Sequence, residues 1–460
     1  MTTHLWSGRF DAPPDLAAFA WGSSFGFDRR LFEDDVTGSR AWARGLARAG
    51  VLSADEADSI EAALTNVLDR GRSEPAFVDG TDEDVHSFVE RLLVERLGDA
   101  GRRLHTGRSR NEQVSLDLRL YLRRRIPLLQ RGIERTIAAL SGQALAAGDA
   151  LMPAYTHLRP AQPVMVAHFF LAHVAPLRRD HDRFAAASSE ADALPLGSGA
   201  IAGTSYAVDV QALARDLGFS RVVANSIDAS SDRDFAATFI YACALTMVHL
   251  SRLAEDLIIL CGEEHQFFEL ADALSTGSSM MPQKKNPDPL ELVRGKTGRA
   301  VGHLMALLTT MKGLPSGYNK DLQEDKHAVF GAEDTLTGCL MVTQSVVEGL
   351  SLNRARAESA ASGLLLATDV ADYLVGRGVP FRRAHEIVGA LVRKLHGEGR
   401  EFASLALEEW RAASELFDAD VITRVTARAS VAAKRTPQST APPAVQDALS
   451  ETERWLDARR

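Results

Sequence analysis

Apolar residues recur at alternating steps of three and four along three long stretches of the chain. The stretches span residues 231–272, 290–311 and 329–350. This spacing is typical of helices that bury one narrow face against nearly parallel neighbours. The first stretch opens with Ser231-Asp-Arg-Asp234, whose side-chain oxygens can satisfy the free amides of a first turn. The pattern predicts three helices with heptad-like seams.

Two further long helices are expected before these. One covers about residues 111–148, with Pro127 as a kink, and carries apolar residues at the same spacing. The other begins at Pro163, a favourable first helical residue, and runs to about Ala193. Strands with alternating polarity are not predicted between them. The expected fold is all-α, with an elongated central helical bundle.

The flanks have shorter helices, which suggests three domains. Residues 1–105 are expected to form a small helical N-terminal domain, residues 106–353 the long-helix bundle and residues 354–460 a small helical C-terminal domain. Several narrow seams in one chain suggest that bundles from more than one subunit pack together. The alternative, that every seam is satisfied within one chain, remains open at this point.

Composition narrows the class of protein. The 460 residues are 45% hydrophobic and 25% charged, which excludes a disordered chain. A net charge of −9 argues against nucleic acid as a partner. Three cysteines (Cys243, Cys261 and Cys339) are too few for a disulfide framework and favour a reducing compartment. No secretory signal is visible, and the most apolar stretch, 164–177, is shorter than the roughly 20 residues of a membrane span. We therefore expect a cytoplasmic protein without a membrane partner.

Four polar segments interrupt the apolar pattern, at residues 104–113, 155–163, 275–289 and 317–326. The third offers a small, Gly-containing turn for an anion, followed by the ammonium groups of Lys284 and Lys285. Alternatively, this segment is a flexible connection between two helices, although such connections are usually shorter.

The other three segments are ambiguous from their residues alone. His157 precedes a predicted helix beside a hydroxyl and an arginine, so it is either a general acid or base or an ordinary surface residue. Arg108 and Arg110 at a helix start suggest a carboxylate or phosphate site, or else a solvated first turn. The last segment is either a hydrogen-bonding site or a solvated loop.

Other kinds of site fit poorly. Residues 197–202 match a dinucleotide fingerprint only loosely, because no strand precedes them and Pro195 stands where one would end. No spacing of histidine, cysteine or carboxylate residues is typical of a metal site. A Ser278–His157 hydrolytic pair lacks the strand–turn–helix elbow that such a nucleophile needs.

Taken together, the polar segments match a known group of enzymes. Residues 277–287 (Gly-Ser-Ser-Met-Met-Pro-Gln-Lys-Lys-Asn-Pro) resemble the signature of the fumarase/aspartase superfamily, whose members eliminate a nitrogen or oxygen group to give fumarate or a close relative. Within it, residues 5–10, 106–111, 155–162 and 318–326 are similar to the argininosuccinate lyase family. Glu112 and Ser7 depart from the residues expected there, Asp and Gly. The resemblance implies a homotetramer whose active sites each draw on three subunits.

The resemblance also implies a reaction, the cleavage of N-(L-arginino)succinate to arginine and fumarate. It implies Ser278 as the base, activated by turn amides and Lys284, and His157 as the acid, oriented by Glu291. The 275–290 loop is expected to close over the substrate. No metal or cofactor is expected, because the substrate's own carboxylate is the electron sink.

The implied substrate-binding residues fall into groups by the part of the substrate they meet. Those for the succinyl carboxylates are Thr156, Lys284 and Asn286, and those for the arginine part and its surroundings are Ser24, Asp28, Arg110, Asn111, Tyr318, Gln323 and Lys326. Arg233 is expected to shape the loop or bind an anion. The rivals are another lyase of the superfamily, such as adenylosuccinate lyase or aspartase, and a recruited eye-lens structural protein.

Overall fold

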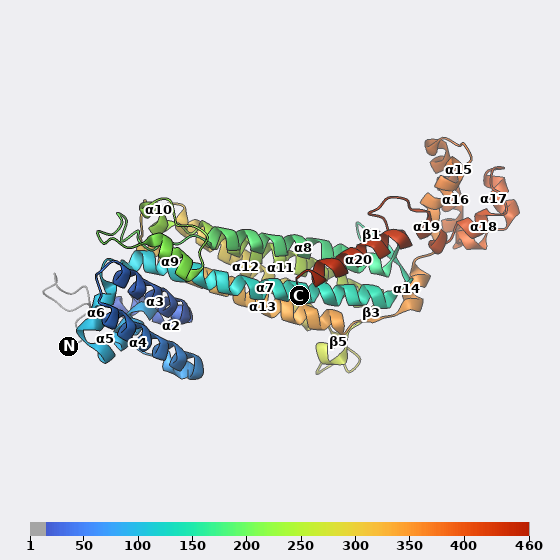
Figure 1. Ribbon diagram of the computed structural model, residues 1–460. Helices are drawn as coiled ribbons and strands as arrows, with labels where there is room; N and C mark the ends of the chain where they lie inside the picture. Colours follow the sequence, from blue (N-terminus) through green and yellow to red (C-terminus); the bar gives the residue numbers. More distant parts are fainter. Residues whose placement is uncertain (1–14, 460) are drawn as a thin grey trace. The chain divides into compact units, whose positions relative to one another are not determined.

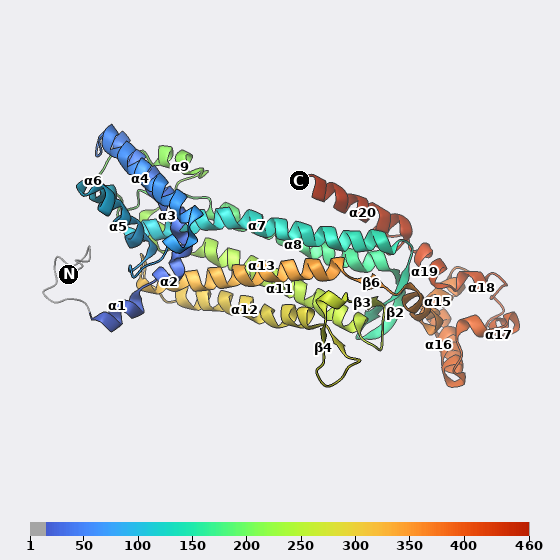
Figure 2. The ribbon, with the colours of Figure 1, turned by 90° about the horizontal axis from the view of Figure 1, so that it is seen from below.

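The computed structural model describes residues 15–459, most of which are helical (Figure 1). Five long helices dominate: α7 (Arg110–Ala147), α8 (Val166–Ala191), α11 (Asp234–Cys261), α12 (Asp288–Met311) and α13 (Asp325–Glu348). Segments of these helices lie alongside one another in both ribbon views (Figures 1 and 2). The all-α prediction is confirmed. The segment 5–10 that contributed to the family resemblance lies outside the described residues.

Two of the three predicted seams are almost wholly buried, and in the third, on α12, Thr297, Leu304 and Met311 are half-buried. The seam of α13 is buried along its whole length, at Val329, Ala332, Leu336, Cys339, Thr343, Val346 and Leu350. On α11, Ile240, Cys243, Met247, Leu250, Ala254 and Leu257 are buried, whereas Cys261 at the helix end is half-buried. The three-and-four spacing therefore identified the packed faces correctly, because residues at these steps share one side of a helix.

Several predicted helix boundaries were wrong. Pro163 lies in strand β2 (Arg159–Met165), not at a helix start, and α8 begins only at Val166. Ser231 ends the short helix α10 (Ser226–Ser231), and α11 is instead capped by the Asp232 carboxylate, which accepts the Asp234 N–H at 2.8 Å. The same helix ends at Cys261 rather than near residue 272.

The described chain also contains strands that were not predicted from the sequence. The described chain contains three two-stranded antiparallel pairs. They are β1 (Leu151–Thr156) with β2, β3 (Phe268–Glu269) with β6 (Ser351–Leu352), and β4 (Thr276–Gly277) with β5 (Lys285–Asn286). All are short, and the prolines and polar residues of β2 hide the alternation on which a strand prediction depends.

The described chain divides into two compact units, each made of three segments. Unit 1 comprises residues 15–129, Asp182–Ala244 and Arg299–Thr335, and unit 2 comprises Gln130–His181, Leu245–Gly298 and residues 336–459. Each of the five long helices contributes part of its length to each unit. The three-domain division from the sequence stays a prediction.

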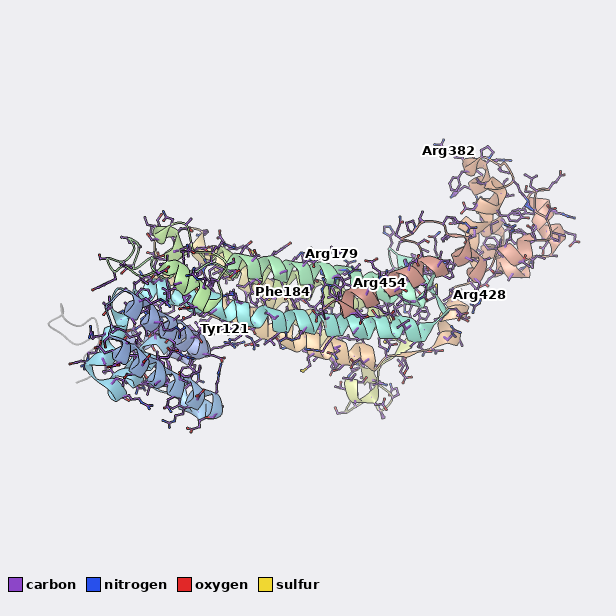
Figure 3. The ribbon with its side chains drawn as sticks, in the orientation of Figure 1. Tyr121, Arg179, Phe184, Arg382, Arg428 and Arg454 are labelled. Carbon is purple, nitrogen blue, oxygen red and sulfur yellow. The ribbon has the colours of Figure 1, made fainter. Side chains whose placement is uncertain are left out.

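Unit 1 contains the N-terminal helices and one part of the bundle. Its shorter elements include α1 (Leu16–Gly22), α2 (Phe25–Asp28), α3 (Phe32–Arg48), α4 (Ala54–Ser73), α5 (Val85–Leu97), α6 (Asp99–Arg102) and α9 (Val210–Leu217). A capping box formed by Ser53 and Glu56 is present at the start of α4. In the bundle, Tyr121 packs on Phe330 with ring centroids 5.0 Å apart, and Phe184 packs on Phe239 at 5.9 Å. Figure 3 labels Tyr121 on α7 and Phe184 on α8.

Unit 2 contains the other part of the bundle and the C-terminal helices. These are α14 (Arg354–Ala360), α15 (Ala367–Val375), α16 (Phe381–Glu398), α17 (Leu407–Ala413), α18 (Val421–Arg424), α19 (Ala427–Ala433) and α20 (Pro442–Asp457). The core of α15–α18 is aromatic: Trp410 stacks on Phe402 at 5.6 Å and contacts Phe417 at 5.0 Å. Within residues 15–459, none of the helices is both long and apolar enough to cross a bilayer.

Candidate active site

The predicted site residues fall into two groups, one in each unit. Unit 1 contains Arg233, which was expected to shape the loop or bind an anion, together with those expected at the arginine part of the substrate, Ser24, Asp28, Arg110, Asn111, Tyr318, Gln323 and Lys326. Unit 2 contains those expected at the scissile bond and the succinyl carboxylates, Thr156, His157, Ser278, Lys284, Asn286 and Glu291. We refer to them as the arginine group and the elimination group.

Asp28 is central to the arginine group. It is buried at the end of α2, where its Oδ2 accepts the Ser24 hydroxyl at 2.5 Å and its Oδ1 accepts the Val85 N–H at 3.0 Å. The pKa of Asp28 is raised to about 6: burial and the nearby Asp84 raise it, and together they outweigh the two hydrogen bonds and Lys326, which lower it. The site therefore holds a carboxylate that titrates close to neutral pH.

A buried charge cluster fixes Lys326 at the start of α13. Its Nζ lies 2.8 Å from Asp325 Oδ1, and Arg233 Nε donates to Asp325 Oδ2 at 2.5 Å. Burial alone would raise the pKa of Asp325, but Lys326 and Arg233 outweigh it and hold that pKa below its usual value. Arg233 is thus occupied by an internal carboxylate. Nearby, burial raises the pKa of Tyr318 to about 12, so its hydroxyl stays protonated.

The remaining members of the arginine group lie on polar loops and helix ends. Arg110, the first residue of α7, has its Nε 3.5 Å from Asp84 Oδ2. The Asn111 side-chain amide donates to the Ala200 carbonyl at 3.4 Å. Gln323 donates from its side chain to the Gly22 carbonyl at 3.3 Å. The structure therefore brings segments that are 300 residues apart in the sequence into one cluster.

Asp84 belongs to the same cluster but was not among the site residues predicted from the sequence. It caps α5 by accepting the Ser87 N–H at 2.7 Å, and it also faces Arg110 and raises the pKa values of Asp28 and Tyr318. The signal was present in the acidic run 82–84, directly before α5, but a helix cap explains such a run equally well.

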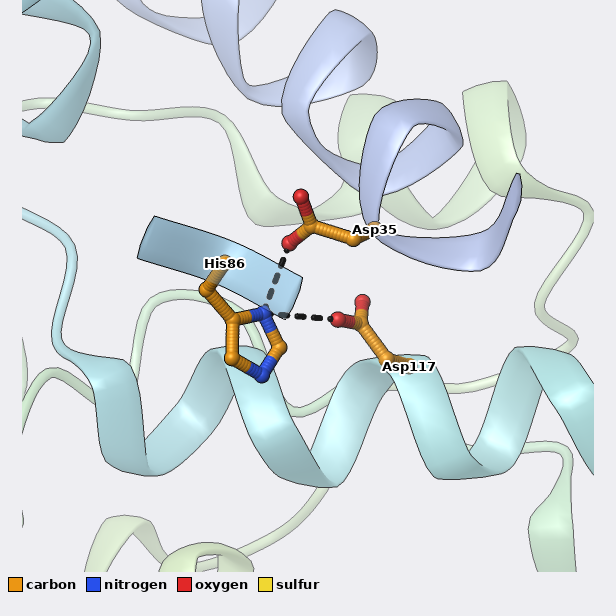
Figure 4. Close-up of side chains that lie close together, drawn as sticks. All are labelled: Asp35, His86 and Asp117. Carbon is orange, nitrogen blue, oxygen red and sulfur yellow. Dashed lines mark hydrogen bonds and ion pairs between the residues drawn. The ribbon is translucent and has the colours of Figure 1, made fainter. Parts of the chain in front are cut away.

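A buried cluster holds the first turn of α5 in place. His86 Nδ1 lies 2.8 Å from Asp35 Oδ1 on α3 and 3.2 Å from Asp117 Oδ2 on α7 (Figure 4). These three residue types can hold a cation, and their ligand atoms lie within 4.8 Å of one another. Arg108 lines the same small pocket and supplies positive charge to both carboxyl groups. The contacts are those of an ion-pair network that joins three helices beside Asp84 and Val85.

The elimination group begins at the turn between β1 and β2. Thr156 pairs with Arg159 across a two-residue turn, and both turn residues have positive φ, 55° at His157 and 56° at Leu158. Non-glycine residues disfavour this left-handed region, and such strain often occurs at ligand-binding sites. The turn presents His157 as an exposed residue at the tip of the hairpin.

Ser278 lies in the loop between β4 and β5, whose register pairs Thr276 with Asn286. Its Oγ accepts the N–H groups of Met280 at 3.3 Å and Met281 at 3.0 Å. Two donors aimed at one oxygen stabilise negative charge on it. Two turn amides therefore face this hydroxyl, while the role of Ser278 as the base stays a prediction.

The two lysines of this loop differ. Lys285 is held by Asp272, whose Oδ1 lies 2.8 Å from the Lys285 Nζ, and by the Leu270 carbonyl. Lys284 is exposed and has no carboxylate partner among the described residues. Glu291, in the first turn of α12, is also exposed and lies 3.8 Å from Arg294 Nη2. Within the described chain no hydrogen bond joins Ser278, His157 and Glu291.

Comparison with known proteins shows the family to which the chain belongs. The profile of a family described as lyase matches residues 8–302, and one described as argininosuccinate lyase C-terminal matches residues 364–432. An argininosuccinate lyase of Roseiflexus sp. (strain RS-1) is 49% identical over 99% of this chain and 100% of its own length. That of Moorella thermoacetica is 47% identical over 98% of both chains.

Solved structures share the fold. An EDDS lyase in complex with formate superimposes with a TM-score of 0.85 at 25% identity, covering 98% of this chain and 92% of its own. A class II fumarase from Schistosoma mansoni gives 0.75 at 15% identity, covering 87% and 90%. Because the family profile spans more than half of the sequence and the curated relatives align nearly end to end, the chain belongs to the argininosuccinate lyase family of the fumarase/aspartase superfamily and is a carbon–nitrogen lyase.

Proposed function

We propose that this protein cleaves N-(L-arginino)succinate reversibly to L-arginine and fumarate. A proton leaves the succinyl carbon next to a carboxylate, the neighbouring C–N bond breaks, its electron pair leaves with the guanidino nitrogen, and that nitrogen gains a proton. The observation that carries the proposal is the buried arginine group, in which a carboxylate, an ammonium group and a phenol from distant segments converge.

The arginine group suits the arginine part of this substrate. Asp28 supplies a negative charge for the α-amino or guanidinium cation, and Arg110, Asn111 and Lys326 supply donors for the α-carboxylate. Tyr318 and Gln323 complete the arginine part. Arg233 acts indirectly, because its guanidinium is bound to Asp325 and thereby fixes Lys326.

The elimination group suits the bond-breaking step. Ser278 acts as the base, since the Met280 and Met281 amides and the charge of Lys284 stabilise its alkoxide. His157 acts as the acid at the leaving nitrogen, with Glu291 as its partner. Thr156, Lys284 and Asn286 hold the succinyl carboxylates, and closure of the 275–290 loop excludes water.

We also propose a homotetramer in which each active site draws on more than one subunit. His157, Lys284 and Glu291 are exposed in a single chain, whereas the proposed proton transfers need a site without bulk water. Helix α12 exposes large apolar side chains at Leu292, Val301, Met305 and Leu308. Its glycines at 295, 298 and 302 have open space beside them, so another helix can approach closely.

We also propose a pathway and a cellular compartment for this protein. A reaction that releases arginine suits arginine biosynthesis, and the free cysteines Cys243, Cys261 and Cys339 suit the reducing cytoplasm.

The proposal is tested with the purified protein. We expect arginine and fumarate to appear in equal amounts from argininosuccinate, with the same rate in the presence of a metal chelator. Adenylosuccinate and aspartate are the matched comparison substrates. Cleavage of either of these, with argininosuccinate left intact, would assign the chain to a different reaction.

Arginine binding should depend on the titration of Asp28. Because this carboxyl has a pKa of about 6, it becomes neutral as the pH falls through 6, and the affinity for the arginine cation should fall with it. Ser24→Ala removes the hydroxyl that lowers this pKa, so the loss of affinity should move to higher pH. Calorimetric titration of arginine between pH 5 and 8 measures both effects. An Asp28→Asn variant that retained the same pH dependence would contradict the assignment.

A further inference from the structure

The proposed roles leave one conspicuous segment of unit 1 unused, the glycine-rich loop 195–206. Its sequence matches a dinucleotide fingerprint loosely, but the element that precedes it is helix α8 and not the strand that this fingerprint follows. Gly197, Gly199 and Gly203 have φ values of 100°, 57° and 87°, in the region that favours glycine. A side chain at Gly199 would place Cβ 2.4 Å from the Gly203 carbonyl oxygen, so the loop folds tightly on itself.

This loop is tied to the first turn of α7 by a single buried carboxylate. Glu112 is fully buried, its Oε1 accepts the Ser109 N–H at 3.0 Å and its Oε2 accepts the Gly197 N–H at 2.7 Å. The Gly199 N–H also donates to it. Three amides from two segments thus converge on Glu112, and a buried N–H that lost its acceptor would be costly.

The loop also lies between the two polar segments of the arginine group. Asn111 donates to its Ala200 carbonyl at 3.4 Å. A Cβ on Gly107 would lie 2.6 Å from the Tyr206 ring and 2.8 Å from the Thr204 hydroxyl, and one on Gly317 would lie 3.3 Å from the Ile201 side chain. These approaches put the loop against both the 106–113 and the 317–326 segments.

Some of its side chains remain accessible. Ile201 and Tyr206 are 45% and 44% exposed although they contact these segments. The Tyr206 phenol near Gly107 and the Ile201 side chain near Gly317 are suited to a ligand with a charged end and a methylene chain, which is the form of an arginine moiety.

We propose that Glu112 is a positioning residue for substrate binding. Its carboxylate holds loop 195–206 against the start of α7, and the loop forms a wall of the arginine subsite, with Tyr206 facing the ligand. The identity of the ligand rests on the proposed function, whereas the tie between Glu112 and the loop does not.

The main test replaces Glu112 by glutamine. A glutamine has a similar size but offers only one acceptor oxygen and an NH₂ group in place of the other. The Ser109 and Gly197 amides, which donate to different oxygens of Glu112, therefore cannot both keep their acceptor. We expect KM for argininosuccinate to rise by about tenfold with kcat within about threefold, and exchange of the 196–204 amides to accelerate by at least about tenfold. Glu112→Asp keeps the carboxylate and should restore most of the parent behaviour.

The matched control is Glu333→Gln. Glu333 is an equally buried carboxylate of unit 1, bonded to Tyr121, Arg30 and Arg125 on other elements. This variant should lower thermal stability while leaving KM and the exchange of the loop unchanged. Tyr206→Phe tests the wall separately, since this exposed position tolerates the change, and it should raise KM without loss of stability.

The outcomes distinguish this inference from the proposed function. A parent protein that does not cleave argininosuccinate refutes the proposed function, and the exchange measurement then still tests the tie to Glu112. A parent that is active, with Glu112→Gln and Tyr206→Phe variants that leave KM unchanged, overturns the positioning role. Equal effects of Glu112→Gln and Glu333→Gln on loop exchange would show a general loss of stability instead.

Discussion

Replacing Ser278 by alanine is expected to lower kcat for argininosuccinate cleavage by about 10²–10⁴-fold, the usual contribution of a positioned base. The Oγ of this serine accepts two backbone N–H groups, from Met280 and Met281. That arrangement favours the oxygen when it carries negative charge and so lowers the free-energy cost of forming an alkoxide. Alanine removes the acceptor oxygen, so the Met280 and Met281 amides then donate to water.

The effect should be confined to the chemical step. The base gains its interaction with the substrate only in the transition state, so kcat and kcat/KM should fall together while substrate affinity changes little. Single-turnover measurements and calorimetric binding separate the two quantities. Ser279→Ala is the matched control, because it removes the neighbouring hydroxyl from the same exposed loop. A Ser278→Ala enzyme with the kcat of the parent would exclude this residue as the base.

Mixing two inactive variants should restore activity. In a single chain Ser278 and His157 have no hydrogen bond between them, and His157 is exposed at the tip of its hairpin. If each active site takes the serine from one subunit and the histidine from another, hybrid tetramers contain intact sites. In a random mixture of Ser278→Ala and His157→Asn chains, about a quarter of the sites should have both residues, one half times one half.

The experiment is a comparison of co-expressed or co-refolded pairs. Each variant alone should lose about 10²–10⁴-fold in kcat, so recovery to about a quarter of the parent activity is a large signal. Ser278→Ala mixed with Ser278→Gly is the control, since no subunit in that mixture has the serine. Native mass spectrometry verifies that hybrids form. Hybrid tetramers without activity would show that one subunit supplies both groups.

The helices illustrate what local sequence determines. The seams of α11 and α13 were predicted from residues at steps of three and four, and nearly all of them are buried. Residues at these steps share one face of a helix, so the pattern alone specifies which side is packed. The predicted helix boundaries were less accurate. Pro163 is compatible with a helix start as well as with a short strand, and the residue that it pairs with, Pro153 in β1, is not one of its sequence neighbours.

The site shows the same distinction. The motifs around Ser278 and Tyr318 identified the superfamily, because their residues resemble its known signatures. The sequence by itself thus determined the helical class, the packed faces and the family of reaction. Only the tertiary structure decided that Asp84 raises the pKa of Asp28, that Arg233 is bound to Asp325, and that Glu112 holds a loop 85 residues away. Charge, burial and hydrogen bonding at these atoms are set by neighbours that the fold brings from distant segments, whereas helix periodicity is set within a few turns.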